Sequence, residues 1–493
     1  MHLGLDLGTS GVKAVLTGAA GEVLAQATAP LAVSRPRPLW SEQDPAEWWR
    51  ATEAALAALR RTHDLSGVRA LGIAGQMHGA VLLDAADAVL RAAILWNDGR
   101  CGTECRELEA AEPRAAAITG NLVMPGFTAP KLLWVRRHEP EIFARTRRVL
   151  LPKDWLRLRL TGEAISEMSD AAGTLWLDVA ARRWSPEMLA ATGLSESQMP
   201  ALVEGSAPAG RLRPEAAAAL GLPPGIPLAG GAGDNAGGAV GIGCTEPGDA
   251  FLSLGTSGVI FVSDPGFLPD PGRAVHAFCH ALPGRWHRMS VILSAAASLS
   301  WITRVTGAAD EAALLAEVER AGLAAAHGPV FLPYLSGERT PHNDPHASGQ
   351  FFGLTAGTER ADLARAVLEG VAFAMADGLE ALEARGARIP ALAAIGGGAR
   401  SRAWLRILAA TLDRPVLTVT GAETGPALGA ARLARIACGD GGIAEVCAKP
   451  AIAAVIEPEG DLAAGLAPRR ATYRRLYPAL RDLFAAAHPE TVR

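Results

Sequence analysis

A single acidic side chain, Asp234, stands inside a run of small residues, GAGDNAGGAVG, at positions 231 to 241. Because the glycines carry no side chains, a ligand can approach the backbone closely there. The run follows an apolar segment, IPLAGG, and can begin a helix whose N-terminus faces that ligand. A carboxylate in this place can orient a bound hydroxyl group and accept its proton during phosphoryl transfer. The simpler alternative is an aspartate that caps the helix and does nothing else.

The hexapeptide LGTSGV occurs twice, at residues 7 to 12 and again at residues 254 to 259. Both copies interrupt apolar, alternating runs, so each predicts a β-hairpin with glycine, threonine and serine in its turn. Hydroxyls and backbone N–H groups in such turns suit phosphate oxygens, and two facing turns would hold a nucleotide between two domains. Two ordinary turns related by duplication are the alternative. In the first turn we assign phosphate binding to Gly8, Thr9 and Ser10.

The two copies differ just before the turn, where Asp6 in the first corresponds to Ser253 in the second. A carboxylate beside a polyphosphate would repel it unless a magnesium ion lay between them. We therefore predict that Asp6 takes part in catalysis by handling Mg²⁺. Lys13, in the following strand, is a weaker candidate for offsetting phosphate charge. A lysine on a strand is more often simply solvated. The GxxxxGK[ST] spacing of a Walker A loop is absent.

Two similar series of strands and helices, each beginning with one of the two hairpins, would position these residues. In the first half a strand over EVLAQATA, a helix over DPAEWWRATEAALAALRR and a buried strand over VRALGIAG follow. In the second half a strand over GRWHRMSVIL and a helix over SAAASLSWITRVTG follow, and later segments up to TGPALGAARLARIA alternate strand and helix. We predict two related α/β domains, residues 1–245 and 246–493, divided near the segment TEPG.

The composition indicates a globular protein that works on small molecules. The chain has 493 residues, of which 49% are hydrophobic and 20% charged, and its formal net charge is -4. It has no block of lysine or arginine, so we expect no nucleic-acid partner. It also lacks a signal-peptide pattern and a long apolar run, so we expect no membrane association. Its six cysteines lack CxxC spacing, and we interpret them as reduced thiols in a cytoplasmic protein.

Several longer segments resemble the FGGY family of carbohydrate kinases, within the actin-like ATPase superfamily. GFTAPKLLWVRRH (126–138) and GQFFGLTAGTERADLARAVLE (349–369) resemble the two signatures of that family. GQMHG, WNDGR, LPKDWLRLRLTG and LSGERTPHNDP are most similar to its xylulokinase branch. The resemblance runs along essentially the whole chain. It implies an α/β fold of two ribonuclease-H-like domains flanking a deep catalytic cleft, with sugar bound on the first domain and ATP on the second.

The resemblance also implies roles for individual residues. Asp234 would be the catalytic base, and Met77, His78, Asp234 and Asn235 would contact the sugar. For ATP it implies contacts from Gly255, Thr256, Gly397, Gly398 and Ser401. Without it, a lone histidine is more often structural, and a glycine triplet is more often a tight turn. The remaining polar residues stay open: Trp96, Asn97, Asp98 and Arg100 either line the sugar pocket or brace it, and Glu338 and Arg339 either join the substrate region or form an ion pair.

The expected activity is phosphorylation of D-xylulose by ATP with Mg²⁺, in a cleft that closes to exclude water from the γ-phosphate. A kinase for another sugar, polyol or sugar acid, such as gluconate, ribulose or glycerol, is the nearest alternative. A nucleotide-driven clamp of the chaperone or actin type is a more distant one, because it would leave Asp234 and the Met77–His78 pair without a task. The Ala-rich C-terminal helices and the family resemblance favour a homodimer.

Overall fold

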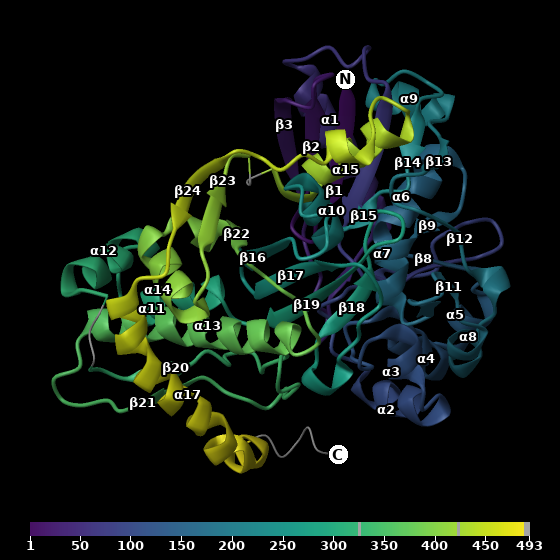
Figure 1. Ribbon diagram of the computed structural model, residues 1–493. Coiled ribbons are helices and arrows are strands. Elements are labelled where there is room, and N and C mark those ends of the chain that lie inside the picture. Colours follow the sequence, from purple (N-terminus) through teal and green to yellow (C-terminus); the bar gives the residue numbers. More distant parts are fainter. Residues whose placement is uncertain (324–326, 422–423, 488–493) are drawn as a thin grey trace.

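Two mixed β-sheets organise the computed structural model, which describes residues 1–323, 327–421 and 424–487 (Figure 1). In the first sheet the strand order is β13–β14–β5–β1–β2–β3, and β15 also pairs with β5. β1, β2 and β3 form an antiparallel meander, whereas β5 runs parallel to β1. The strands are β1 (His2–Leu7), β2 (Gly11–Thr17), β3 (Val23–Pro30), β5 (Ala70–Gly75), β13 (Pro208–Arg211), β14 (Pro227–Ala229) and β15 (Ala232–Gly233).

The second sheet repeats this arrangement in the order β18–β19–β17–β16–β22–β23–β24. β16, β17 and β19 form the antiparallel meander, and β22 runs parallel to β16. The shared order confirms the duplicated α/β fold that the two hairpins predict. The strands are β16 (Ala250–Leu254), β17 (Gly258–Asp264), β18 (His276–Cys279), β19 (Trp286–Ile292), β22 (Leu392–Ile395), β23 (Val416–Val419) and β24 (Ile452–Ile456).

Amphipathic helices cover the sheets. α1 (Pro45–Arg60) begins where the Asp44 carboxylate accepts the Ala46 N–H at 2.9 Å, and it buries Trp48 against β2 and β3. None of the described helices combines the length and the apolar composition that crossing a bilayer requires. The other helices that matter below are α2 (Gly102–Ala111), α4 (Thr128–His138), α6 (Pro152–Thr161), α7 (Met168–Ala171), α10 (Asp234–Gly241), α11 (Ala296–Val305), α13 (Arg360–Glu383), α14 (Arg402–Leu412), α15 (Gly425–Ala437) and α17 (Gly460–Ala487).

A long insertion between β5 and β14 fills the space beside both sheets. It contains α2, α4, α6 and α7; the apolar side chains of α2, α4 and α7 share one core with the second sheet, whereas those of α6 pack in the core of the first sheet. Phe127 and Leu132 of the insertion belong to the same buried cluster as Phe251 and Phe261 of β16 and β17. The two halves therefore meet through a continuous hydrophobic core, which fixes the walls of any site between them.

Helix α15 links the two halves in a way that the order of elements does not reveal. It lies between β23 and β24 of the second sheet in the chain, yet it packs on β1 and β5 of the first sheet and crosses α10 (Figure 1). This close approach needs glycine, because a Cβ on Gly4 or Gly72 would lie 1.9 or 2.0 Å from a carbonyl oxygen of α15. A Cβ on Gly429 of α15 would lie 1.8 Å from the carbonyl oxygen of Gly237 in α10. The backbones of the two helices are thus in direct contact.

Gly429→Ala tests this contact. The added methyl group would collide with the Gly237 carbonyl, so we expect the free energy of unfolding to fall by about 1–3 kcal/mol, seen as a lower thermal midpoint. Gly102→Ala in α2 is the matched control, because nothing lies within 4 Å of its added Cβ. That control should be neutral or slightly stabilising. Equal midpoints for the two variants would contradict the close crossing.

Candidate active site

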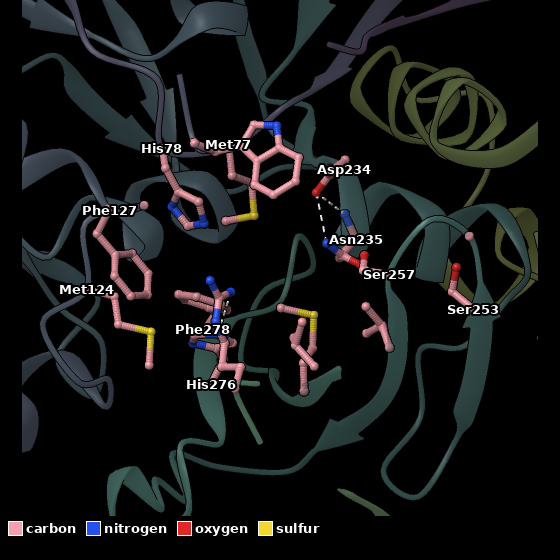
Figure 2. A pocket seen from close by; sticks show the side chains of 17 residues that line it. Met77, His78, Met124, Phe127, Asp234, Asn235, Ser253, Ser257, His276 and Phe278 are labelled. Atoms are coloured by element: carbon pink, nitrogen blue, oxygen red, sulfur yellow. Dashed lines mark hydrogen bonds between the residues drawn. The ribbon is translucent and has the colours of Figure 1, made fainter. Parts of the chain in front are cut away.

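A cavity of about 250 Å³ lies between the two halves (Figure 2). The first half contributes Met77, His78 and Asp234 to its lining, and the second half contributes Gly255, His276 and Arg339. The structure therefore brings together the predicted base, the predicted sugar-binding pair and two residues of the second phosphate turn, Gly255 and Ser257. Asn235 also lines the cavity, beside Asp234.

Asp234 is the first residue of α10 and follows β15 directly. Its Oδ1 accepts hydrogen bonds from the backbone N–H and the side-chain amide of Asn235, at 2.7 and 2.9 Å. Its Oδ2 accepts no hydrogen bond from any described residue. Burial raises the pKa of Asp234 to about 6, although the bonds from Asn235 act in the opposite direction. The carboxylate is thus oriented through one oxygen and available through the other.

Asp6 lies near the end of β1, opposite Lys13 across the first hairpin. Burial and the charge of Asp234 raise the pKa of Asp6 to about 7, while Lys13 acts to lower it. Its Oδ1 is buried and receives no hydrogen bond from the described residues. A buried carboxylate oxygen without a partner suits either a proton or a metal ion. Asp6 therefore has the chemistry expected of a group that handles a cation.

The hydroxyl of Thr9 belongs to a hydrogen-bond chain. It donates to Gln76 Oε1 at 3.0 Å and accepts from the indole N–H of Trp96 at 2.9 Å. Gln43 continues the chain, because it donates to the Thr9 carbonyl oxygen at 2.8 Å and accepts from Gln76 Nε2 at 3.0 Å. The first turn is therefore fixed by two buried glutamines. The predicted phosphate contact of Thr9 would come from its backbone N–H, since its hydroxyl is already occupied.

His78 projects into the cavity from a strained position. Its φ of 68° is in the left-handed region that non-glycine residues seldom adopt. Its carbonyl oxygen accepts hydrogen bonds from Thr128 Oγ1 at 3.0 Å and Lys131 Nζ at 3.1 Å, both in α4. Its Nδ1 lies 2.6 Å from the Gly173 carbonyl oxygen. Burial and the nearby Lys131 charge lower the pKa of His78 to about 3, so the ring is neutral at physiological pH.

The segment from Trp96 to Arg100 divides into lining and bracing residues. Trp96 lines the cavity, and its 41% exposure shows that part of the residue also faces solvent. Arg100 instead pairs with Asp98 at 2.6 Å and stacks on Trp40 at 3.6 Å from the ring centroid. Asp98 in turn accepts the Ser41 N–H at 2.6 Å. Asn97 is absent from the lining, and its Oδ1 is buried.

Two family models cover most of the chain. The N-terminal domain of the FGGY family of carbohydrate kinases matches residues 1–241, and the C-terminal domain of the same family matches residues 250–438. The chain belongs to this family. The two-domain fold of this FGGY kinase is accordingly that of the actin-like ATPase type of kinase.

Its relatives include xylulose kinases. The xylulose kinase of Escherichia coli (strain K12) is 56% identical over 98% of this chain and 100% of its own length. The crystal structure of a xyloylose kinase from Brucella ovis is 54% identical and superposes with a TM-score of 0.94, covering 98% of this chain and 99% of that one. A gluconate kinase from Lactobacillus acidophilus is 25% identical, with a TM-score of 0.91 and coverage of 97% of both chains.

The nucleotide residues predicted for this FGGY kinase separate into two groups. Gly255 lines the cavity, and the carbonyl oxygens of Gly255 and Thr256 accept N–H groups from the start of α11. Gly397, Gly398 and Ser401 follow β22 and lie outside the cavity lining. A Cβ on Gly398 would lie 2.8 Å from Leu254 Cβ, so this turn packs directly on β16. The Ser401 side chain caps α14 by accepting the Trp404 N–H at 3.2 Å.

The second half supplies cavity residues that no sequence motif indicates. His276 and Phe278 lie on β18, whose pattern indicates a buried strand and nothing more. Arg339 Nη1 lies 3.4 Å from His276 Nε2, and His276 Nδ1 lies 3.0 Å from Asn121 Oδ1. Burial lowers the pKa of His276, so its ring is also neutral. The sequence left Arg339 open, and the structure places its guanidinium at the cavity.

Glu338, the neighbour of Arg339, faces a different environment. Its Oε1 accepts the backbone N–H groups of Leu293 and Arg339, at 3.1 and 2.7 Å. Burial raises the pKa of Glu338 to about 8. In the part of the chain that the structure describes, no ion pair joins the Glu338 and Arg339 side chains. Arg339 therefore lines the cavity, whereas Glu338 is a buried carboxyl group beside it.

Proposed function

We propose that this FGGY kinase transfers the γ-phosphoryl group of ATP to the 5-hydroxyl of D-xylulose. The observation that carries the proposal is the cavity that joins Asp234 and the Met77–His78 pair to the Gly255 turn. It is supported by 56% identity to the E. coli xylulose kinase over essentially the full length of both chains. A sugar held by the first half would face the phosphates held by the second.

Asp234 would act as the base in this reaction. Asn235 holds one carboxylate oxygen, which leaves Oδ2 to accept a hydrogen bond from the attacking hydroxyl. As the oxygen forms its bond to phosphorus, the proton passes to Oδ2. General-base assistance of this kind is typically worth ~10²–10⁴ in rate. The raised pKa of Asp234 makes it a better proton acceptor than an ordinary aspartate.

His78 would accept a hydrogen bond from the sugar, and Arg339 would donate hydrogen bonds to it. Because a carbonyl oxygen can only accept, the short contact with Gly173 places the proton of the neutral ring on Nδ1. Nε2 then presents a lone pair, which suits a hydroxyl group of the sugar. Arg339, by contrast, presents N–H donors to oxygen atoms of the ligand.

We further propose that ATP is used with Mg²⁺ and that Asp6 helps to hold the ion. The buried Oδ1 of Asp6 has no protein partner, and carboxylate oxygens are ligands that Mg²⁺ prefers. The ion would neutralise charge on the phosphates during transfer. Lys13, across the hairpin from Asp6, would add a second positive charge near the phosphates. The cytoplasmic location and the homodimer stay predictions.

A panel of sugars tests the substrate. We expect ADP release to depend on added sugar and kcat/KM to be highest for D-xylulose among D-xylulose, D-ribulose, gluconate and glycerol. The gluconate kinase shares the fold at a TM-score of 0.91, so cavity contacts and not the fold must make this choice. A higher kcat/KM for another member of the panel would overturn the choice of xylulose and retain a sugar kinase.

Asp234→Asn tests the base. We expect kcat to fall by roughly 10²–10⁴, because the amide cannot accept the proton, while nucleotide binding stays largely intact. Asp44→Asn is the matched control, since Asp44 also stands at a helix N-terminus but caps α1 away from the cavity. Normal turnover by Asp234→Asn would reduce Asp234 to a helix cap.

The pH profile of the wild-type enzyme gives a second measurement of the same group. Protonation removes the base, so at a Mg²⁺ concentration high enough to keep Asp6 ionised, kcat/KM should fall as the pH decreases through about 6, the raised pKa of Asp234. An aspartate with its ordinary pKa of 3.8 would keep the enzyme active well below that pH. A flat profile between pH 7 and pH 5 would contradict the assignment.

Asp6→Asn tests the metal role. Loss of the charge should raise the Mg²⁺ concentration for half-maximal rate by about tenfold or more, because an amide oxygen is a weaker ligand than a carboxylate. A magnesium titration at saturating ATP and sugar measures this shift. Asp64→Asn at the exposed loop after α1 is the control and should titrate like the wild type. An unchanged titration for Asp6→Asn would refute the assignment.

A further inference from the structure

A cluster of one lysine and three carboxyl groups is buried beneath the turn that carries Asp234, and burial together with the neighbouring acids raises the pKa of Asp170. Lys153 Nζ, in the first turn of α6, lies 2.7 Å from Asp154 Oδ1, 3.3 Å from Asp170 Oδ2 and 3.4 Å from Glu167 Oε1. None of these four side chains exposes any surface. Burial disfavours the charge of Lys153, but the surrounding carboxylates outweigh it and raise its pKa. The ammonium group is therefore a permanent charge in the interior.

Ser169 connects this cluster to the backbone just before Asp234. Glu167 accepts the N–H groups of Ser169 and Asp170 at the start of α7, at 2.7 and 2.9 Å. The Ser169 hydroxyl donates to Glu167 Oε2 at 2.8 Å and accepts the N–H of Gly233 at 3.0 Å. Gly233 is the residue before Asp234 and the N-cap of α10. One side chain thus spans the distance from the buried ions to the start of the helix that presents the carboxylate.

Arg157 holds the other end of the same turn. Its guanidinium donates to the carbonyl oxygens of Ala229 and Gly230, where β14 ends. Between these two anchors Gly231 has a φ of 79°, and a Cβ there would lie 1.9 Å from the Ile73 carbonyl oxygen. The turn from β14 to α10 is therefore fixed at both ends by side chains of the insertion and is pressed against β5 in the middle.

Stability alone does not account for these charges. Removing ions from water costs several kcal/mol per ion, and apolar replacements of buried ion pairs are often as stable or more so. Asp154 Oδ2 and Asp170 Oδ1 also lack hydrogen bonds from the described residues, so the cluster is not optimised for its own stability. A precisely held catalytic group, on the other hand, requires rigid support behind it.

We propose that Ser169, held in place by Glu167 and Lys153, is a positioning residue for phosphoryl transfer. By fixing Gly233 it sets the carboxylate of Asp234 against the acceptor hydroxyl. Ser169 lies outside the cavity lining and acts through the backbone. The inference rests on the proposed role of Asp234 as base, and it extends the site to residues in α6 and α7 that lie outside the cavity lining.

Ser169→Ala tests the proposal, with Ser166→Ala as its matched control. Ser166 is also buried, lies three residues away on β9 (Ile165–Glu167), and its Oγ has no hydrogen-bond partner among the described residues. We expect Ser169→Ala to lower kcat by roughly 10- to 100-fold, as a small misplacement of a catalytic group does. The KM for ATP should match that of Ser166→Ala, whereas the thermal midpoint should be lower, because Ser169→Ala leaves the buried N–H of Gly233 without its acceptor. A kcat equal to that of the control would overturn the proposal.

A double-mutant cycle separates positioning from general structural damage. If Ser169 acts through Asp234, adding Ser169→Ala to Asp234→Asn should lower the residual rate by less than about twofold. A further loss as large as that in the wild-type background would overturn the proposal, because the serine would then act independently of the base. If the wild type fails to turn over D-xylulose, the proposed substrate is wrong, and the cycle is run on the sugar of the panel that supports ADP release.

Discussion

The chemistry of this kinase depends on three parallel strands that end at the same level. Leu7, Gly75 and Gly233 are aligned in register across β1, β5 and β15. The chain leaves these strands into the first phosphate turn, the Gln76–His78 loop and Asp234, in that order. Because parallel strands present their carboxyl ends at one edge, Met77 and Asp234, which lie far apart in the chain, converge on one cavity. A shift of one residue in this register would turn the side chains to the opposite face of the sheet.

The same helix that presents Asp234 also carries the contact between the halves. α10 begins at the cavity with Asp234, and Gly237 on the same helix touches Gly429 of α15. α15 comes from the second half of the chain but lies on the first sheet. Glycine makes this possible, because backbone atoms approach each other without intervening side chains. The position of the base is therefore tied to the packing of an element that is distant in sequence.

Burial has opposite outcomes at the cavity and beneath it. At the cavity it disfavours charge, lowering the pKa of His78 to about 3 and raising that of Asp234 to about 6. Beneath the turn, Lys153 keeps its charge because carboxylates surround it at 2.7 to 3.4 Å. The buried cluster has fixed partners and is suited to rigid support of the turn above it.

The amino-acid sequence is enough to predict the repeated hairpins, the strands and helices that follow each of them, the family and the placement of Asp234 after a buried strand. These features depend on local patterns, namely alternation, helical periodicity and glycine in tight turns. Packing in three dimensions is what brings α15 onto the first sheet, His276 and Arg339 to the cavity, and Ser169 to Gly233. Each of these is a contact between segments far apart in the chain, so its geometry depends on how the two halves pack and no local pattern encodes it. Thr9 is a further example. Its residue type suits phosphate binding, but in the folded chain its hydroxyl is hydrogen-bonded to Gln76 and Trp96, which are distant in sequence.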